Sequence, residues 1–556
     1  MSTDKPWVKN YPEGTPDHLE LDPNRTLITL LDEAESEFQE LTAFSNFGST
    51  LSYKEVEKLS KQFAAYLQND LGLKKGDRIA LMMPNIMQYP VAIFGAIRAG
   101  LIVVNVNPLY TPRELKHQIQ DSGARTIMIF ENSAHVLDTV FSELEIEHVI
   151  ITKIGDLLSF PKGILMNVAV KYLKKIVPPY NLPKAVQFKD TLKHPIADFK
   201  VVPVSNNDIA FLQYTGGTTG LSKGATLSHG NLNANMEQLR SVLTSVIGEE
   251  GEDIYMNVLP IYHIYSLTVC VLSGYGNGAL NVLITNPRDT SALVEEMKKW
   301  PFTTFNGVNT LYESLLNHPE IKNVNFDAMK ISGSGGMKTL KSTAERWQAL
   351  TGKVLLEGYG LSETSVCLST SPVYMKEFTG SVGLPIPETE ISIRDDDGNE
   401  VERGQPGEIC ARGPQIMQGY WQNEEATAEV IGEDGFFKTG DIGTMDEEGF
   451  LRIVDRKKDM IIVSGFNVYP NEIEDVVCMH PDIIEAASIG VPDEKTGEAV
   501  KLFVVLGGEK TLTKEAIIDY CRENLAAYKV PKQIEFMDEE LPKTNVGKIL
   551  RRALRE

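Results

Sequence analysis

Glycines, threonines and one lysine are concentrated between Tyr214 and Thr226, in a pattern suited to binding phosphate groups. An apolar run over residues 209–214 predicts a buried strand that ends at this loop. Glycines allow successive backbone N–H groups to point into one concavity, where they can bind phosphate oxygens. The threonine hydroxyls and the lysine ammonium add further donors. We therefore expect a polyphosphate to be bound by Thr215, Gly216, Gly217, Thr218, Thr219, Gly220 and Lys223.

This loop is not a Walker A loop. Lys223 is followed by Gly224, and the next helical signal begins only near Ser228, whereas a Walker A loop opens directly into a helix. A mobile linker is the alternative interpretation of such a composition. The segments described next favour the phosphate loop, because each supplies a group that a nucleotide site needs.

The segment Glu357-Gly-Tyr-Gly-Leu-Ser-Glu-Thr364 is suited to binding a flat ring and a metal ion. Glycines on both sides of Tyr359 leave space for a ring to stack, and Glu363 offers a hard oxygen ligand for Mg²⁺. A helix N-terminus capped by Ser362 is the structural alternative, and it is compatible with the functional one. The segment Ile331–Gly336 is also rich in glycine. It predicts a strand that ends in a glycine turn, which is either a plain tight turn or a surface that a ligand can approach closely.

Four side chains have both a functional and a plain structural interpretation. Asp441 follows Thr439 and Gly440 and is suited to accepting both hydroxyls of a ribose, although a turn aspartate fits equally well. His263 lies in an apolar run, and this context alone favours a hydrogen-bonded core histidine. Lys543 and Lys548 lie on a predicted turn near the C-terminus, where a solvated basic tail is the alternative.

The first third of the chain alternates helices and strands. A capping box at Ser52 and Glu55 opens a helix that Gly72 ends, and a second box at Thr111 opens a helix that Gly123 ends. Strands are expected at 78–83, 101–105 and 126–130, with a further helix at 88–99. This order predicts an α/β fold with a parallel sheet covered by helices, in which phosphate loops follow the carboxyl ends of strands.

The pattern changes twice further along the chain. Residues 379–454 combine short strands with Asp-Gly and Glu-Gly turns, which predicts a small β-rich subdomain. Helices at 471–479 and 513–524 and strands at 486–491 and 502–506 predict a separate α+β domain. We expect a large N-terminal domain over 1–456 and a small mobile domain over 457–556, with the charged run 455–459 as the hinge.

The length, net charge and cysteine content limit the classes of binding partner and the cellular compartment that we expect for this protein. A chain of 556 residues needs more than one core. The net charge of −22 argues against nucleic acid as a partner, because a phosphate backbone requires a basic surface. Five scattered cysteines suit reduced thiols, and we expect neither a secretory signal in residues 1–20 nor a membrane span. These features favour a cytoplasmic protein.

Taken in order, these motifs resemble those of the acyl-adenylate-forming superfamily, which includes acyl-CoA synthetases, luciferases and peptide-synthetase adenylation domains. The similarity runs over nearly the whole chain. The phosphate loop, Leu259-Pro-Ile-Tyr-His263 and Ser464-Gly-Phe-Asn-Val-Tyr-Pro-Asn-Glu472 are most similar to bacterial long-chain fatty-acid–CoA ligases. Gly217 and Ser222 differ from the residues most common at these positions of the loop in the superfamily, but neither difference removes a charged or hydrogen-bonding role.

The resemblance implies ATP and CoA as co-substrates, a fatty acid as the acid, and Mg²⁺ as the metal. A carboxylate would attack the α-phosphorus of ATP to give acyl-AMP and pyrophosphate, and the CoA thiol would then displace AMP. The loop would hold the β- and γ-phosphates, with Thr215 and Glu363 at the metal. The nucleotide site that it implies comprises Gly335, Glu357, Gly358, Tyr359, Ser362, Asp441 and Arg456.

Lys548 would bridge the carboxylate and an α-phosphate oxygen, and with Thr215 and His263 it completes the catalytic group that the resemblance implies. The C-terminal domain would then swing about Lys458 and bring Gly465 to a pantetheine tunnel. A medium-chain or aryl-CoA ligase with the same mechanism is an alternative, and a non-catalytic nucleotide-binding homologue is a further one. The oligomeric state is open, with a homodimer among the alternatives.

Residues 157–189 form a basic island in this acidic chain. They include six lysines and no acidic residue, interleaved with apolar residues such as Ile164 and Leu173. This pattern suggests peripheral contact with an anionic lipid surface, on the inner face of a membrane, and an ordinary amphipathic surface helix is the alternative.

Overall fold

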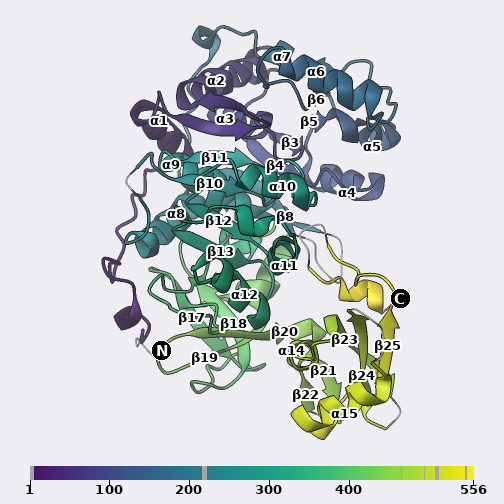
Figure 1. Ribbon diagram of the computed structural model, residues 1–556. Coiled ribbons are helices and arrows are strands. Elements are labelled where there is room, and N and C mark those ends of the chain that lie inside the picture. The colour runs from purple at the N-terminus through teal and green to yellow at the C-terminus, as the bar shows by residue number, and fades with distance from the viewer. Residues whose placement is uncertain are drawn as a thin grey trace.

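The computed structural model describes residues 5–215, 222–248, 250–464, 466–493, 495–507, 512–544 and 548–555. Two large sheets with their helices form the upper and middle parts of the molecule, a small antiparallel sheet lies below them, and the C-terminal part lies to one side (Figure 1). This arrangement confirms the predicted α/β class with a β-rich subdomain and a smaller α+β part.

The first sheet places the phosphate loop. It has the strand order β7-β6-β5-β3-β4-β8-β9, and all neighbouring strands are parallel except β8 and β9. The loop therefore joins two antiparallel strands, and β9 is a strand that the sequence did not predict. The bounds are β3 (Arg78–Met82), β4 (Ile102–Val106), β5 (Thr126–Phe130), β6 (His148–Thr152), β7 (Val186–Gln187), β8 (Ile209–Thr215) and β9 (Lys223–Ser228).

Helices cover this sheet as the capping signals predicted. The side chains of Ser52 and Thr111 accept hydrogen bonds from the backbone N–H groups of Glu55 and Glu114, and Gly123 ends its helix with φ of 64°. Every residue of α3 is buried, and the guanidinium of Arg98 within it pairs with Asp32 and Glu35. The helices are α1 (Leu27–Glu37), α2 (Tyr53–Asn69), α3 (Gln88–Arg98), α4 (Pro112–Ser122), α5 (Ala134–Val140), α6 (Lys162–Val168), η4 (a π-helix, Ala169–Leu173) and α7 (Phe188–Thr191).

The second sheet has nine strands, in the order β16-β15-β14-β13-β12-β10-β11-β1-β2, with a parallel centre. Its strands are β1 (Thr42–Asn46), β2 (Ser49–Ser52), β10 (Ile254–Asn257), β11 (Leu280–Leu283), β12 (Thr304–Gly307), β13 (Ile331–Gly335), β14 (Leu356–Tyr359), β15 (Ser369–Thr370) and β16 (Leu384–Pro385). Its helical elements are α8 (His229–Leu243), η6 (a π-helix, Ser266–Leu272), α9 (Ser273–Gly276), α10 (Thr290–Met297), α11 (Asn309–Leu316), α12 (Lys341–Thr351) and η8 (Ser362–Thr364).

The β-rich part is a four-stranded antiparallel sheet, and its tight turns lie where Gly398 and Gly449 adopt φ of 84° and 91°. It also contains a helix that the sequence did not predict, α13 (Glu424–Val430), with Asn423 as its cap. The strands are β17 (Glu390–Arg394), β18 (Gly407–Arg412), β19 (Phe437–Met445) and β20 (Leu451–Arg456).

The C-terminal part has its own sheet, in which β25 runs parallel to β24 and the other pairs are antiparallel. A separate apolar core that includes Ile473, Leu502 and Ile517 stabilises it. The elements are η9 (Lys457–Asp459), β21 (Ile461–Val463), β22 (Phe466–Val468), α14 (Pro470–Cys478), β23 (Ile483–Asp493), β24 (Gly497–Leu506), α15 (Lys514–Asn524) and β25 (Gln533–Met537).

An N-terminal strap over residues 5–26 connects the β-rich part to the large sheets. Trp7 is buried in the core of the β-rich part, and Asn10 donates a hydrogen bond to the carbonyl of Glu448 at 2.8 Å. Arg25, at the other end of the strap, pairs with Glu237 of α8 at 2.9 Å. The strap therefore joins two parts of the molecule that are far apart in the sequence (Figure 1).

All five cysteines are free thiols. Over the ranges that the structure describes, no helix has the length and apolar character needed to cross a membrane.

Candidate active site

The two ends of the phosphate loop are fixed by α4. Thr215 and Lys223 face one another across β8 and β9. Tyr214 donates a hydrogen bond to Asp121 at 2.5 Å, and the ring of His117 donates to the carbonyl oxygen of Ser222 at 2.8 Å. These two contacts fix the backbone on both sides of the loop, at Tyr214 before it and at Ser222 after it. The loop residues between them, Gly216, Gly217, Thr218, Thr219 and Gly220, lie outside the described residues, as does Gly465.

Tyr420 connects the loop lysine to Glu363. The ammonium of Lys223 lies 5.1 Å from the centroid of the Tyr420 ring, within cation–π range, and the Tyr420 hydroxyl donates to Glu363 Oε1 at 2.9 Å. The backbone around Tyr420 runs beside β9, where Trp421 N–H donates to Gly224 and Thr226 N–H donates to Gly419. Sequence reasoning missed Tyr420, whose only signal is an aromatic residue after Gly419.

The acidic and hydroxyl oxygens at this point suit Mg²⁺. Glu363 lies in η8, which packs against β8 and β9, and its buried carboxylate is connected through Tyr420 to Lys223, the strand partner of Thr215. Among the described residues there is no group of three or more His, Cys, Asp or Glu side chains able to hold a metal. A set of one carboxylate and one hydroxyl matches Mg²⁺, which usually takes few protein ligands and completes its shell with phosphates and water.

Asp441 is held by two of the predicted nucleotide residues. Tyr359 donates its hydroxyl to one carboxylate oxygen at 2.7 Å, and Arg456 Nε lies 2.8 Å from the other. Asp441 and Arg456 are direct partners across β19 and β20, so the pairing is set by strand register. Asp441 lies within a strand, not in a turn, which excludes the plain alternative of a turn aspartate. Burial, first, and the neighbouring Asp441 raise the pKa of Tyr359.

Of the two glycines that flank Tyr359, Gly360 has a different role from the one expected, whereas a Cβ at Gly358 would meet nothing closer than 3.9 Å. A Cβ at Gly360 would lie 1.9 Å from the carbonyl oxygen of Val366, so this glycine permits close backbone packing and does not clear space for a ring. A Cβ at Gly335 would lie 3.1 Å from the Gly358 carbonyl oxygen and 3.2 Å from the ring of Tyr265. Gly335 and Gly358 are also direct partners in the sheet, so both flank one side of the predicted ring site.

Two further residues that were predicted to bind the nucleotide, Ser362 and Glu357, contribute to the backbone structure next to the site. Ser362 is the first residue of the short 3₁₀-helix η8 and does not cap an α-helix. Glu357 accepts a hydrogen bond from Thr339 N–H at 3.3 Å, and burial raises the pKa of its carboxyl to about 7. Its side chain therefore fixes the turn after β13, which borders the same cleft.

Lys548 reaches the cleft from the C-terminal hairpin. Burial lowers the pKa of its ammonium to about 8; Arg456 acts in the same direction, while Asp441 and Glu363 act against it. Burial, and secondarily the charge of Lys548, lower the pKa of His263 to about 4, so the imidazole is neutral. Tyr265 N–H donates to Nδ1 of that ring at 3.2 Å.

The turn predicted at the C-terminus separates its two lysines. Thr544 N–H donates to the carbonyl of Lys548 at 2.7 Å, which closes the hairpin. Lys543 pairs instead with Glu485 at 2.5 Å and with Glu540 at 3.0 Å. Only Lys548 of the pair therefore contributes charge to the cleft.

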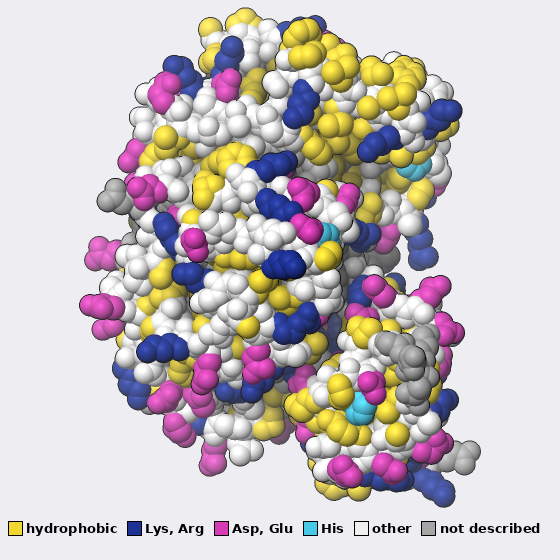
Figure 2. All heavy atoms as spheres, viewed as in Figure 1, with side chains coloured by type: hydrophobic (Ala, Val, Ile, Leu, Met, Phe, Trp, Pro, Cys, Tyr) yellow, Lys and Arg dark blue, Asp and Glu magenta, His cyan; other side chains and the backbone are white. Residues whose placement is uncertain are grey.

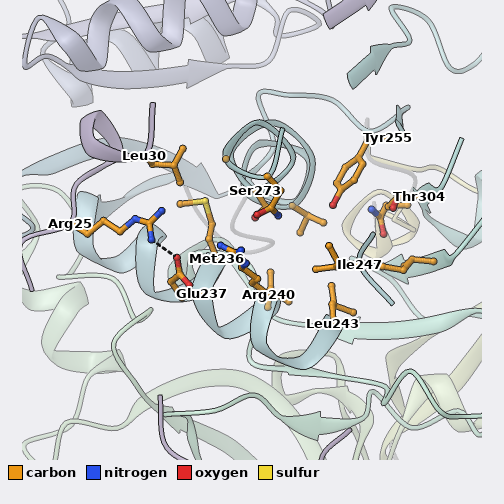
Figure 3. Close-up of a pocket in the computed structure, with 16 residues that line it drawn as sticks. Arg25, Leu30, Met236, Glu237, Arg240, Leu243, Ile247, Tyr255, Ser273 and Thr304 are labelled. Atoms are coloured by element: carbon orange, nitrogen blue, oxygen red, sulfur yellow. Dashed lines mark hydrogen bonds and ion pairs between the residues drawn. The ribbon is translucent and has the colours of Figure 1, made fainter. Parts of the chain in front are cut away.

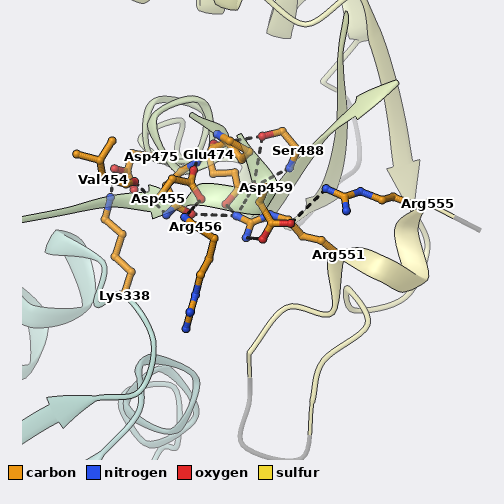
Figure 4. A network of polar contacts seen from close by, with 12 residues as sticks. Lys338, Val454, Asp455, Arg456, Asp459, Glu474, Asp475, Ser488, Arg551 and Arg555 are labelled. Carbon is orange, nitrogen blue, oxygen red and sulfur yellow. Dashed lines mark hydrogen bonds and ion pairs between the residues drawn. The ribbon is translucent and has the colours of Figure 1, made fainter. Parts of the chain in front are cut away.

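A polar network joins the C-terminal part to the strand that carries Arg456 (Figure 4). Asp455 accepts from Asn471 N–H at 2.7 Å, and Arg551 donates to Asn471 at 2.9 Å and to Glu474 at 2.8 Å. Asp459 lies 3.6 Å from Arg551 and 3.2 Å from Arg555. Figure 4 shows the Arg456 side chain pointing away from this network.

The predicted hinge residues are shared between the two parts. Lys457 pairs with Asp396 at 2.8 Å and Glu408 at 3.1 Å, both in the β-rich part. Burial, helped by Arg456, lowers the pKa of Lys458. The same boundary is crossed by an ion pair between Lys338 and Asp475. These contacts define the position in which Lys548 enters the cleft.

An apolar cavity of about 70 Å³ lies beside α8 and the nine-stranded sheet (Figure 3). The Arg25–Glu237 ion pair lies at one edge of it. On β13, Ile331 lines the cavity, and Gly333 and Gly335 continue the same face toward Tyr265 because side chains alternate along a strand. A Cβ at Gly333 would lie 2.2 Å from Asn306 Oδ1, so this glycine leaves room for the Asn306 side chain. The apolar lining comprises Leu30, Met236, Leu239, Leu243, Ile247 and Val269.

Comparison with known proteins defines the class. The AMP-binding enzyme family matches residues 31–421, and the AMP-binding enzyme C-terminal domain matches residues 472–548. The chain belongs to the AMP-binding enzyme family.

The most similar relatives and a solved structure cover almost the whole chain. A long-chain-fatty-acid–CoA ligase of Yersinia pestis is 52% identical over 100% of this chain and 98% of the relative. A long-chain-fatty-acid–CoA ligase of Haemophilus influenzae is 49% identical, with the same coverage. MatB from Rhodopseudomonas palustris, solved with bound ATP, is 28% identical with a TM-score of 0.78, over 96% of this chain and 98% of that one.

Proposed function

We propose that this protein is a long-chain fatty-acid–CoA ligase. A fatty-acid carboxylate oxygen attacks the α-phosphorus of ATP, pyrophosphate leaves, and acyl-AMP forms. The sulfur of CoA then attacks the acyl carbon, AMP leaves, and the thiol proton passes to solvent. The observation that carries this proposal is the contact of Asp441 with Tyr359 and Arg456, together with the chain of contacts from Lys223 through Tyr420 to Glu363. The full-length identity of 52% with a named ligase of this class supports the acyl substrate.

The chain's own residues would position the nucleotide. The loop from Thr215 to Lys223 would hold the β- and γ-phosphates, and Tyr359 would stack against adenine. The carboxylate of Asp441, already oriented by Tyr359 and Arg456, would accept the ribose hydroxyls. Such prior orientation removes a reorganisation cost from the reaction. Mg²⁺ fits beside Glu363 and Thr215, where it would offset the charge of the leaving pyrophosphate.

Lys548 would supply charge at the reacting atoms. Its pKa of about 8 leaves it protonated at neutral pH, so it can neutralise negative charge that builds between the carboxylate and the α-phosphate. His263, neutral because its pKa is about 4, would border the acyl site without adding a second positive charge. These two side chains would thus contribute one cation and one neutral hydrogen-bonding ring.

The second half-reaction requires the cleft to be rearranged. We assign residues 1–456 to the adenylation domain, including the β-rich subdomain at 379–454, and residues 457–556 to a mobile domain. Rotation about Lys458 would withdraw Lys548 and bring the loop at Gly465 to the pantetheine arm of CoA. Two contacts of Figure 4 that cross this boundary, Asp455–Asn471 and Lys338–Asp475, support the division, because such polar contacts, unlike a continuous apolar core, can exchange for water.

At about 70 Å³ the cavity of Figure 3 would hold about two or three methylene groups, so we assign it to the end of an acyl chain and base the chain length on the named relatives. It is lined mainly by apolar side chains, and the β13 face with Gly333 and Gly335 leads from it toward Tyr265 beside His263. A hydrocarbon tail would bury apolar surface there at about 0.8 kcal/mol per methylene. A medium-chain or aryl-CoA ligase would need only the part of this path near Tyr265.

The cellular setting belongs to the same proposal. We expect a cytoplasmic enzyme with peripheral contact to the inner face of an anionic membrane through residues 157–189. Homodimer formation also stays a prediction, which light scattering of the purified protein would test.

A thioester assay tests the function. Purified protein with ATP, CoA and saturated acids from butanoic to stearic acid should produce AMP and acyl-CoA, with the long acids preferred. The Lys548→Ala variant should lose adenylation by roughly a hundred- to a thousand-fold while keeping ATP binding. Lys543→Ala, on the same hairpin but facing away, is the matched control. Formation of ADP, or normal adenylation by Lys548→Ala, would refute the mechanism.

A further inference from the structure

The helix formed by α6 and η4 exposes its apolar side to solvent. Seven large apolar side chains between residues 160 and 176 are exposed, including Phe160 at 85% and Leu173 at 78%. Figure 2 shows hydrophobic side chains gathered on the surface in the region where Figure 1 places α6. Soluble proteins rarely leave so continuous an apolar surface without a binding partner. This docking face comprises Phe160, Ile164, Leu165, Val168, Tyr172, Leu173 and Ile176.

The spacing of these residues places them on one side. Five of them follow one another at intervals of four residues, from Phe160 to Ile176. In a regular α-helix this interval drifts steadily around the axis. The π-helical turn over Ala169–Leu173 is wider, which counteracts the drift and keeps Tyr172 in line with Val168.

The opposite side of this helix is fixed to the protein by specific contacts. Gly155 and Gly163 approach so closely that a Cβ on either would lie within 2.3 Å of the other's carbonyl oxygen. Asn167 accepts a hydrogen bond from Gly155 N–H at 2.8 Å, and Lys171 pairs with Glu131 at 2.8 Å. The helix therefore cannot rotate its apolar residues inward without breaking these contacts.

The charge around the docking face is positive. Residues 157–189 contain six lysines and no acidic residue, although the whole chain has a net charge of −22. Within the described ranges, five of these lysines are exposed and form no salt bridge: Lys162, Lys174, Lys175, Lys184 and Lys189. Exposed lysines beside apolar side chains are typical of a surface that contacts negatively charged lipid head groups.

We propose that the docking face binds an anionic phospholipid bilayer, with its apolar side chains inserted between the head groups and the lysines paired with lipid phosphates. This inference rests on the proposed function, because a ligase for long-chain acids gains access to substrate at a bilayer. Phe160 and Tyr172 supply the aromatic rings that favour the interface of a membrane. Lysine stems can lie along the apolar surface while their ammonium groups remain at the phosphates.

The position of the face is compatible with catalysis. Figure 1 shows α6 at one end of the molecule and the C-terminal domain at the other. A bilayer bound at α6 therefore leaves the C-terminal domain and Lys548 free to move. The two activities, docking and ligation, can thus be measured separately.

Vesicle co-sedimentation of the full-length protein tests the proposal. The wild type should sediment with phosphatidylglycerol-containing vesicles, and less with pure phosphatidylcholine vesicles. The Ile164→Ser/Leu173→Ser and Lys174→Glu/Lys175→Glu variants should each lower the partition coefficient by about tenfold or more. Matched controls change exposed residues elsewhere: Val201→Ser/Met479→Ser for the apolar pair and Lys322→Glu/Lys376→Glu for the charged pair.

Each outcome decides the proposal. Absence of wild-type binding, or equal binding by docking-face and control variants, overturns it. If the docking-face variants instead convert a lipid-free dimer to a monomer, the face binds a second copy and the lipid proposal is wrong. Thioester formation from a detergent-dispersed acid should be the same in all variants. Wild type that binds vesicles without forming thioester would refute the ligase function and leave the docking intact.

Discussion

Replacing Arg551 with alanine tests how the segment that carries Lys548 is held within the C-terminal domain. Arg551 donates to Asn471 and Glu474 of α14 and lies 3.6 Å from Asp459. Its side chain is only 14% exposed, and that of Glu474 is 12% exposed. Arg551→Ala would therefore leave the nearly buried carboxylate of Glu474 without its cation. Arg551 itself lies three residues after Lys548, the lysine proposed to catalyse adenylation.

The magnitude follows from this burial. Removing one partner of a buried ion pair costs about 3–5 kcal/mol, and the residual exposure of this pair places the expected value near 3 kcal/mol. The matched control is Arg555→Ala, because Arg555 pairs with the same Asp459 but is 40% exposed. Exposed pairs contribute about 1 kcal/mol or less.

The pH dependence gives a second measure. Burial raises the pKa of Asp455 to about 6, and Arg551 opposes that rise, so the variant should raise this pKa further. A carboxyl whose pKa is higher in the folded state stabilises that state at low pH and loses the effect as pH rises through the folded value. The cost of Arg551→Ala should therefore shrink when the pH is lowered from neutral toward about 5.

Hydrogen exchange in α14 would measure the local opening free energy, and pyrophosphate release would measure adenylation. We expect faster exchange and slower adenylation in Arg551→Ala, with Arg555→Ala close to wild type. Equal effects of the two variants, or a cost that does not change with pH, would refute this account of the network.

Three further predictions concern the cleft and the cavity. Pyrophosphate release should fall as pH rises through about 8, where Lys548 loses its charge, and residual activity of Lys548→Arg should not show this fall; a wild-type plateau well above that pH would contradict the assigned pKa. Tyr420→Phe removes the hydroxyl bound to Glu363 and should raise the Mg²⁺-ATP concentration for half-maximal rate by about tenfold, and an unchanged value would exclude this role. Val269→Phe should fill the cavity and shift the acid preference to shorter chains, whereas an unshifted chain-length profile would place the acyl tail elsewhere.

The elements with local signals could be predicted from the sequence. Ser52 and Thr111 cap their helices through residues three positions away, and Gly123 ends its helix with a positive φ, so neighbouring residues alone determine these ends. The buried parallel strands were equally clear as short apolar runs. The order of nucleotide motifs also placed Tyr359, Asp441 and Arg456 in one site, although their hydrogen bonds depend on strand register.

The contacts that the sequence could not show are non-local. β9 is short and contains Gly224 and polar residues, and it is stabilised by β8 on one side and by the Tyr420 segment on the other. Tyr420 reaches Glu363 over 57 positions of sequence, and no spacing rule connects them. The role of Gly360 depends on the backbone of Val366, which only the folded chain brings near.

The N-terminal strap has a consequence for the order of folding. Asn10 and its partner Glu448 are 438 positions apart, so the strap bonds to a segment that is synthesised much later than the strap itself. Such distant pairing is slow to form and leaves Trp7 without its binding partners during most of translation. The nascent enzyme therefore depends on completing its own late sequence, or on a chaperone, to cover that tryptophan.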